Sequence, residues 1–376
     1  MKKLGVYVHI PFCLSRCAYC DFISSVLTDD SQLNTYVEHI IKEIGLLKES
    51  GVFSEREIDT IYFGGGTPSL LKSAYLRSIL EAIRLNKRAV SQEVTIEANP
   101  ATIDYETLLT YKEAGINRIS IGVQSLNDKT LKAIGRRHNA EQALEAIEIA
   151  EKTGLSISVD LMLGLPFQTK EDIKFFIDEV LKHDVKHIST YMLSLEDGTK
   201  LKAQVEKNEI KVSSDDEKVE LFDYASNLLK EKGFIRYEVS NFAKIGFEAK
   251  HNSKYWTRGE YIGIGLGAHS LISNERFYNK ETFSEYYKDL DEGRLPHVIE
   301  ATLDESEAEE EYIMLALRTN QGINLADYKA KFNKDFVESH KSGLDLHKDQ
   351  LNILNNNISI KEEYLNVLNQ IVIDLI

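Results

Sequence analysis

The sequence predicts an α/β fold in which six strands of one parallel sheet alternate with helices. Three observations lead to this prediction. Short runs rich in Val, Ile, Tyr and Thr recur along the chain, as is typical of β-strands. Stretches between these runs carry apolar residues at helical spacing. Glycine-rich or polar loops directly follow the strands, at the end where such sheets bind ligands.

The predicted strands are nearly continuous in apolar character, as expected for strands covered on both faces. They span residues 4–10, 59–63, 93–98, 117–123, 156–163 and 187–193. Helices are predicted near 36–48, 70–86, 105–114, 139–152, 170–182 and 214–232. Ser214, followed three residues later by Glu217, predicts a capping box at the start of the last helix. Six such units imply right-handed crossovers, in either a full or partial barrel or an open doubly wound sheet.

The chain changes character after about residue 280. The segment "LPHVIEATLDESEAEEEY" (295–312) is acidic and poor in strand signals, so it is predicted to be a linker that runs into a helix. The residues expected on one face of that helix are Ala308, Tyr312, Leu315, Ala316 and Thr319. We therefore divide the chain into a main domain (1–280), a linker (281–300) and a small, mainly helical C-terminal domain (301–376).

The bulk composition excludes several classes of protein. The net charge of −15 argues against a nucleic-acid partner, because such proteins usually carry a basic surplus. No apolar run approaches the roughly 20 residues of a membrane span, and the first residues lack the features of a signal peptide. Clustered cysteines argue against a secreted disulfide framework. We expect a cytoplasmic protein.

All three cysteines, Cys13, Cys17 and Cys20, lie in the loop after the first strand. Structural zinc would need a fourth ligand, for which His9 is a candidate. A redox C-x-x-C motif would leave Cys13 unused. A [4Fe–4S] cluster would use all three thiolates and leave one iron open. An open position is typical of sites that bind a substrate or cofactor.

Further candidate ligand contacts lie in the glycine-rich loop, in apolar strands and in the "GRRH" segment. The glycines of "GGGTPS" (64–69) allow close approach of the backbone to a ligand. Glu97, Gln124 and Asp160 lie in apolar strands, where an unpaired polar group is costly. A structural pair or a ligand contact would satisfy each of them. Arg136 is either a solvated surface charge or a guanidinium that donates two hydrogen bonds to a carboxylate.

The segment "KHNSKYW" (250–256) contains the one tryptophan of the chain. A histidine such as His251 can ligate heme iron, and aromatic rings such as Tyr255 and Trp256 can pack on a porphyrin. By spacing alone, a hydrogen-bonded histidine in a turn beside two core aromatics is the preferred interpretation.

The C-x3-C-x2-C motif, together with "FGGGTPS", "IEANP", "GRRH", "DLMLGLPFQT", "YEVSNFA" and "GIGLGAHS", resembles the radical S-adenosylmethionine (SAM) superfamily. The resemblance runs from residue 4 to about 325 and falls in the branch of oxygen-independent coproporphyrinogen III oxidases and heme chaperones. It implies a partial (β/α)6 barrel and a [4Fe–4S] cluster on the three cysteines, with SAM on the open iron. The SAM contacts that it implies are Tyr7, Tyr19, Gly65, Gly66, Thr67, Glu97, Gln124, Arg136 and Asp160.

Two positions separate the members of this branch. The oxidases carry a further cysteine two residues after the third, where this chain has Phe22. The 251–256 segment matches the H-N-x-x-Y-W motif of the chaperones. The resemblance therefore implies a heme chaperone with His251 as heme ligand and Tyr255 and Trp256 in the heme pocket. Heme-accepting respiratory proteins are the expected partners, with contact at the membrane surface, and a homodimer is compatible with the sequence. A coproporphyrinogen oxidase and an iron–sulfur electron carrier remain as alternatives.

Overall fold

The computed structural model describes residues 1–84 and 88–376. Its main unit is a twelve-stranded sheet with the order β14-β13-β12-β11-β1-β4-β5-β6-β7-β8-β10-β9. The six predicted strands form its parallel centre and are β1 (Lys2–Ile10), β4 (Arg56–Gly65), β5 (Arg88–Ala98), β6 (Arg118–Gln124), β7 (Ser156–Leu163) and β8 (Val185–Met192). The sheet curves but does not close, because β14 and β9 are its two edges. The fold is therefore the partial barrel that was expected.

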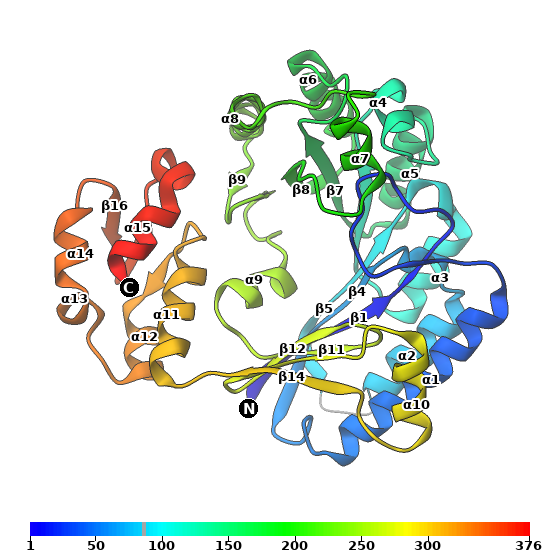
Figure 1. Cartoon of the computed structure of the whole chain (residues 1–376), viewed down its shortest axis with the longest axis horizontal. Helices are drawn as coiled ribbons and strands as arrows, with labels where there is room; N and C mark the ends of the chain where they lie inside the picture. The colour runs from blue at the N-terminus through cyan, green and yellow to red at the C-terminus, as the bar shows by residue number, and fades with distance from the viewer. Residues whose placement is uncertain (85–87) are drawn as a thin grey trace.

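All six predicted helices are present. Their observed ends differ from the predicted ends by up to six residues. They are α1 (Asp30–Glu49), α2 (Ser73–Arg84), α3 (Tyr105–Ala114), α5 (Ala140–Thr153), α6 (Lys170–Val180) and α8 (Asp215–Glu231). The last two residues of the predicted 70–86 helix lie outside the described residues. Figure 1 shows α1 to α6 along the outer side of the curved sheet. The capping box of Ser214 and Glu217 is confirmed at the start of α8.

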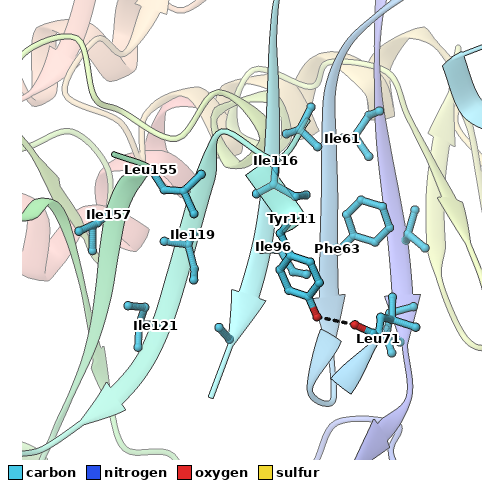
Figure 2. Packing of buried hydrophobic residues seen from close by; sticks show 14 of the residues in the cluster. Ile61, Phe63, Leu71, Ile96, Tyr111, Ile116, Ile119, Ile121, Leu155 and Ile157 are labelled. Carbon is cyan, nitrogen blue, oxygen red and sulfur yellow. Dashed lines mark hydrogen bonds between the residues drawn. The ribbon is translucent and has the colours of Figure 1, made fainter. Parts of the chain in front are cut away.

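The core of the main unit lies between the sheet and these outer helices. Figure 2 shows Phe63, Ile96 and Ile119 of consecutive strands in one layer, all fully buried. Tyr111 of α3 lies across this layer and donates a hydrogen bond from its hydroxyl to the carbonyl of Leu71. Because alternate side chains of a strand point to opposite faces, the remaining strand residues point into the barrel.

Both edges of the sheet contain short strands that were not predicted. β11 (Tyr261–Ile264) pairs parallel to β1, and β12 (His269–Ile272), β13 (Glu275–Asn279) and β14 (His297–Thr302) continue antiparallel. At the other edge, β10 (Asn241–Ala243) and β9 (Ile235–Arg236) follow β8 antiparallel. The remaining short elements of the main unit are β2 (Phe12–Cys13), β3 (Ser25–Val26), η1 (Pro68–Leu70), η2 (Pro100–Thr102), α4 (Asp128–Ala133), α7 (Lys200–Glu206) and α9 (Lys250–Trp256).

The predicted linker 281–300 is wrong, because this stretch belongs to the main unit. It contains α10 (Phe283–Asp291), whose Tyr286 and Leu290 lie in the main core, and most of β14, which pairs with β13. The error has a physical cause. β14 is an edge strand whose side chains are mostly exposed, so its sequence lacks the apolar pattern of a buried strand.

The C-terminal unit has a small apolar core of its own. Its helices are α11 (Glu305–Ala316), α12 (Leu325–Phe332), α13 (Phe336–Ser339), α14 (Lys341–Leu346), η3 (Glu362–Val367) and α15 (Leu368–Leu375). They accompany a three-stranded sheet of β15 (Ile323–Asn324), β17 (Asn357–Ile360) and β16 (Leu351–Leu354). On α11, Tyr312 is buried as predicted, Ile313 is buried in addition, and the helix ends before Thr319.

Candidate functional site

The carboxyl ends of the parallel strands and the loops after them surround a cavity of about 390 Å³. Most residues that were assigned to the site by resemblance line this one cavity. They are Cys13, Cys17, Tyr19, Cys20, Gly65, Gly66, Thr67, Glu97, Gln124, Arg136 and Asp160. The structure therefore brings together residues from loops that lie up to about 150 positions apart in the sequence.

The loop that carries the cysteines is held in place through its backbone. The N–H of Ala18 donates to the carbonyl of Ile134 (2.9 Å), and the Ala18 carbonyl accepts from the N–H of Leu201 (2.7 Å). Ala18 itself is buried, so this point of the loop is fixed while the thiols on either side face the cavity. All three thiols are free of disulfides.

Two side chains donate hydrogen bonds to the cysteine sulfurs. Oγ1 of Thr67 lies 3.4 Å from Sγ of Cys13, and Nη1 of Arg136 lies 3.6 Å from Sγ of Cys17. Burial raises the pKa of the Cys13 and Cys20 thiols. Donors of this kind favour the thiolate form, and bound iron would favour it far more strongly. The thiols are thus placed to act as metal ligands.

The glycine-rich loop approaches the cysteine loop too closely for side chains. A Cβ on Gly66 would lie 3.0 Å from Sγ of Cys13 and 2.8 Å from the carbonyl oxygen of Phe12. At Gly65, where φ is +114°, a Cβ would meet the ring of His9 at 2.5 Å. Both glycines are therefore required by the packing around the cluster loop.

Two buried carboxylates face the cavity from β5 and β7. Glu97 accepts from the hydroxyl of Tyr62 (2.8 Å) and from the N–H of Gly65 (3.1 Å), and burial raises its pKa to about 7. Asp160 accepts from Oγ of Ser120 (3.3 Å), and burial raises its pKa to about 6. Neither carboxylate has an ion-pair partner among the described residues, so a cationic ligand would complete the charge balance.

Two further polar groups in the cavity have unused hydrogen-bonding capacity. Gln124 has a left-handed backbone (φ 68°), and its buried Oε1 has no partner within the described part of the chain. Arg136 donates from Nη2 to the carbonyl of Gly122, while its buried Nε is likewise unpartnered. The cavity thus offers the unpaired acceptor of Gln124, the unpaired donor of Arg136, two carboxylates and three thiols. This set of groups fits a [4Fe–4S] cluster with SAM beside it.

Tyr7 is not among the residues that line the cavity, and its assignment as a SAM contact stays a prediction from resemblance. Its hydroxyl lies 3.0 Å from Nδ1 of His9, and Nε2 of His9 lies 2.9 Å from the carbonyl oxygen of Ile23. Because that carbonyl only accepts, Nε2 carries the proton and Nδ1 accepts from Tyr7. Both nitrogens of His9 are thus used inside the protein, which leaves none for the zinc alternative.

The 250–256 segment forms α9, which lies inside the barrel rather than at its mouth. The N–H groups of Lys250 and His251 donate to the carboxylate of Glu93 at 3.0 and 2.9 Å. The ring of His251 is 1% exposed and lies 2.9 Å from Oγ1 of Thr60 and 2.9 Å from the hydroxyl of Tyr255.

The ring of His251 therefore has no free nitrogen for iron in this structure. Burial also lowers its pKa to about 3, so the ring is neutral at physiological pH. Its two bonded neighbours, Thr60 and Tyr255, are themselves buried or half-buried inside the barrel. The heme site at His251, Tyr255 and Trp256 stays a prediction from resemblance, and it would require the ring of His251 to give up one of these hydrogen bonds.

Sequence reasoning missed several residues that line the cavity. They include Arg16, Asn99, Ser120, Met162, Tyr191, Ser194 and Glu196. The alternation of strand side chains could have found Ser120 and Met162, since each lies an even number of positions from a recognised inward residue, whereas only the pairing of Tyr191 with Met162 places Tyr191 on that face. The loop residues carry no comparable signal.

Comparisons with known proteins agree with this geometry. Residues 7–180 match the Radical SAM superfamily and residues 303–359 match the HemN C-terminal domain. The curated heme chaperone HemW of Lactococcus lactis is 35% identical over 89% of this chain and 86% of its own length. HemW of Buchnera aphidicola from Schizaphis graminum is 40% identical, and that of Escherichia coli 37%, each over 73% of this chain and 71% of its own. The chain belongs to the HemW family.

A solved structure supports the fold of this HemW family member over its full length. Coproporphyrinogen III oxidase (HemN) from Escherichia coli superimposes with a TM-score of 0.85, covering 100% of this chain and 90% of its own, at 22% identity. Both the partial barrel and the C-terminal unit are thus shared with HemN. At this identity the likeness establishes the architecture alone.

Proposed function

We propose that the protein is a heme chaperone that binds heme and a [4Fe–4S] cluster and transfers the heme to acceptor haemoproteins. The observation that carries this proposal is the similarity to curated HemW proteins over up to 89% of the chain. We further propose that the acceptors are respiratory proteins in the cytoplasm or at the membrane surface. None of the helices in the described residues is long and apolar enough to cross a bilayer.

In this proposal the cavity holds the cluster and SAM. The thiolates of Cys13, Cys17 and Cys20 would ligate three irons and leave the fourth for SAM. A reduced cluster of this kind supplies one-electron chemistry. Glu97 and Asp160 would balance the positive charge of SAM, and Oε1 of Gln124 would accept a hydrogen bond from it.

Phe22 supports chaperone activity over porphyrinogen oxidation. Its side chain is 61% exposed at the rim of the cavity, at the position where the oxidases carry a fourth cysteine. A phenyl ring cannot ligate metal, so the site lacks a thiol that the oxidase pattern includes. An exposed aromatic ring is instead suited to contact a flat apolar ligand.

The test is anaerobic reconstitution with iron and sulfide, followed by two parallel assays. Titration with heme should produce a saturable Soret band with defined stoichiometry. Incubation with coproporphyrinogen III, SAM and a reductant should yield no protoporphyrinogen IX. Conversion of coproporphyrinogen III, or a heme spectrum identical to free heme, would refute the proposal. A variant with Cys13, Cys17 and Cys20 all changed to Ala shows whether heme binding depends on the cluster.

A further inference from the structure

A second cavity, of about 820 Å³, lies at the opposite end of the main unit from the cysteines. It is bounded by the start of β1, the segment after α9 and the turn before β13 on the main unit, and by α11 and α12 on the C-terminal unit. Sites between two folded units are common places for ligands. None of the residues in the first cavity lines this one.

Basic side chains from both units converge on this cavity. They are Lys2, Lys3, Arg258, Lys331 and Lys334, against the three carboxylates of Glu260, Glu305 and Glu309. The cations thus outnumber the carboxylates in a chain whose net charge is −15. A local surplus of this sign inside a concavity concentrates anions.

Two of the lysines have no carboxylate partner among the described residues. Neither Lys3 nor Lys331 makes an ion pair there, although Asp327 lies one turn before Lys331 on α12, and Nζ of Lys331 lies 5.6 Å from the ring centroid of Tyr312. Two of the three carboxylates that line the cavity have cationic partners, and the third, Glu305, makes no ion pair within the described residues. Glu260 pairs with Arg56 and Glu309 pairs with Lys334. The ammonium groups of Lys3 and Lys331 therefore remain available to an anion.

Arg258 adds a guanidinium with unused donors. Its side chain is 9% exposed, with Nε 2.6 Å from Glu311 and Nη1 3.1 Å from Asn274, while the buried Nη2 has no hydrogen-bond partner in the described chain. Its left-handed backbone (φ 51°) belongs to the end of α9, where the N–H of Gly259 donates to the carbonyl of Lys254 at 2.8 Å.

We infer that this cavity binds a phosphate-bearing anion, held between Arg258 and Lys3 of the main unit and Lys331 of the C-terminal unit. Several separate cations from different elements suit a dianion with three or more oxygens better than a single carboxylate. Binding there would join the two units, so the ligand would also stabilise their relative position. The inference does not depend on heme transfer.

The experiment uses the full chain in low-salt buffer without phosphate. Pyrophosphate is titrated by calorimetry into wild type, Lys331→Glu and Lys329→Glu, the last being an exposed lysine on the same helix that does not line the cavity. Parallel co-sedimentation uses vesicles of phosphatidylcholine with and without phosphatidylglycerol. These two arms distinguish a soluble phosphate ester from a lipid headgroup as the source of the anion.

We expect wild type and Lys329→Glu to bind one of the two probes, and Lys331→Glu to bind it at least about tenfold more weakly. Lys331→Gln should show an intermediate loss, which separates a charge effect from misfolding. Heme titration of Lys331→Glu should match wild type, so failure here is distinct from failure of the chaperone proposal. Absence of binding to both probes, or equal binding by the two glutamate variants, would overturn the inference.

Discussion

Nδ1 of His251 lies 2.9 Å from Oγ1 of Thr60, which joins the helix inside the barrel to the second parallel strand. The same ring stacks on Tyr62 with centroids 5.2 Å apart, and Tyr62 donates its hydroxyl to Glu97 in the cysteine-lined cavity. The histidine of the H-N-x-x-Y-W motif is thus a packing and hydrogen-bonding partner for the floor of the cavity.

His251→Ala should lower the free energy of unfolding by about 2–4 kcal/mol, because it leaves a cavity and two unpaired hydroxyls. Denaturant unfolding measures this loss. His269→Ala is the matched control, since His269 is more than half exposed, and it should change stability by less than about 0.5 kcal/mol. Heme affinity of the folded His251→Ala protein should equal that of wild type. Loss of heme binding at wild-type stability would restore His251 as a heme ligand.

Binding of SAM to the reconstituted protein should tighten as pH rises from about 6 to 8. Burial raises the pKa of Glu97 to about 7, so the carboxylate that attracts the cationic ligand forms only across this range. Without ligand, the pKa of Glu97 is about 7 in the folded state and 4.5 in the unfolded state. The folded state therefore loses stability as pH rises from 4.5 to about 7, because the unfolded state releases this proton first.

Glu97→Gln should bind SAM more weakly and flatten this pH profile, with a residual slope near pH 6 from Asp160. Tyr62→Phe removes a hydrogen bond that lowers the pKa of Glu97, so the midpoint of the profile should move upward. Equilibrium dialysis with labelled SAM measures both effects. An identical profile for wild type and Glu97→Gln would contradict the role of this carboxylate.

Gly66→Ala should reduce cluster assembly, because the added Cβ would lie 3.0 Å from Sγ of Cys13 and 2.8 Å from a backbone oxygen. Iron and sulfide per chain after anaerobic reconstitution measure the loss. Gly45→Ala is the control, since open space surrounds a Cβ at this position in α1, and it should leave the cluster intact and add up to about 1 kcal/mol of stability. Equal cluster content in the two variants would contradict the packing argument.

The parallel core and most of its site could be predicted from the sequence because both follow regular patterns. β4 and β7 are long and apolar, so their helical neighbours and their carboxyl ends could be located by periodicity. Polar residues in apolar strands, such as Glu97 and Asp160, indicated a ligand site. Burial of such groups costs free energy unless a partner or ligand compensates for the lost water.

What the sequence did not reveal depends on contacts between distant segments. β14 has mostly exposed side chains, so only its pairing with β13 identifies it as a strand. α9 is seven residues long, and the carboxylate of Glu93 in β5 holds its first turn by hydrogen bonds. The sequence around either residue does not predict this contact. The interior position of His251 follows from that contact, whereas the resemblance of its motif predicted a heme ligand.

The most direct test of the chaperone proposal is heme transfer in competition. Reconstituted protein loaded with heme is mixed with a heme-free respiratory cytochrome in the presence of excess apomyoglobin, and the two Soret bands are followed over time. The proposal predicts that heme passes to the cytochrome faster than free heme does under the same conditions, and that apomyoglobin intercepts little of it. Capture of all the heme by apomyoglobin, as for free heme, would contradict the proposal.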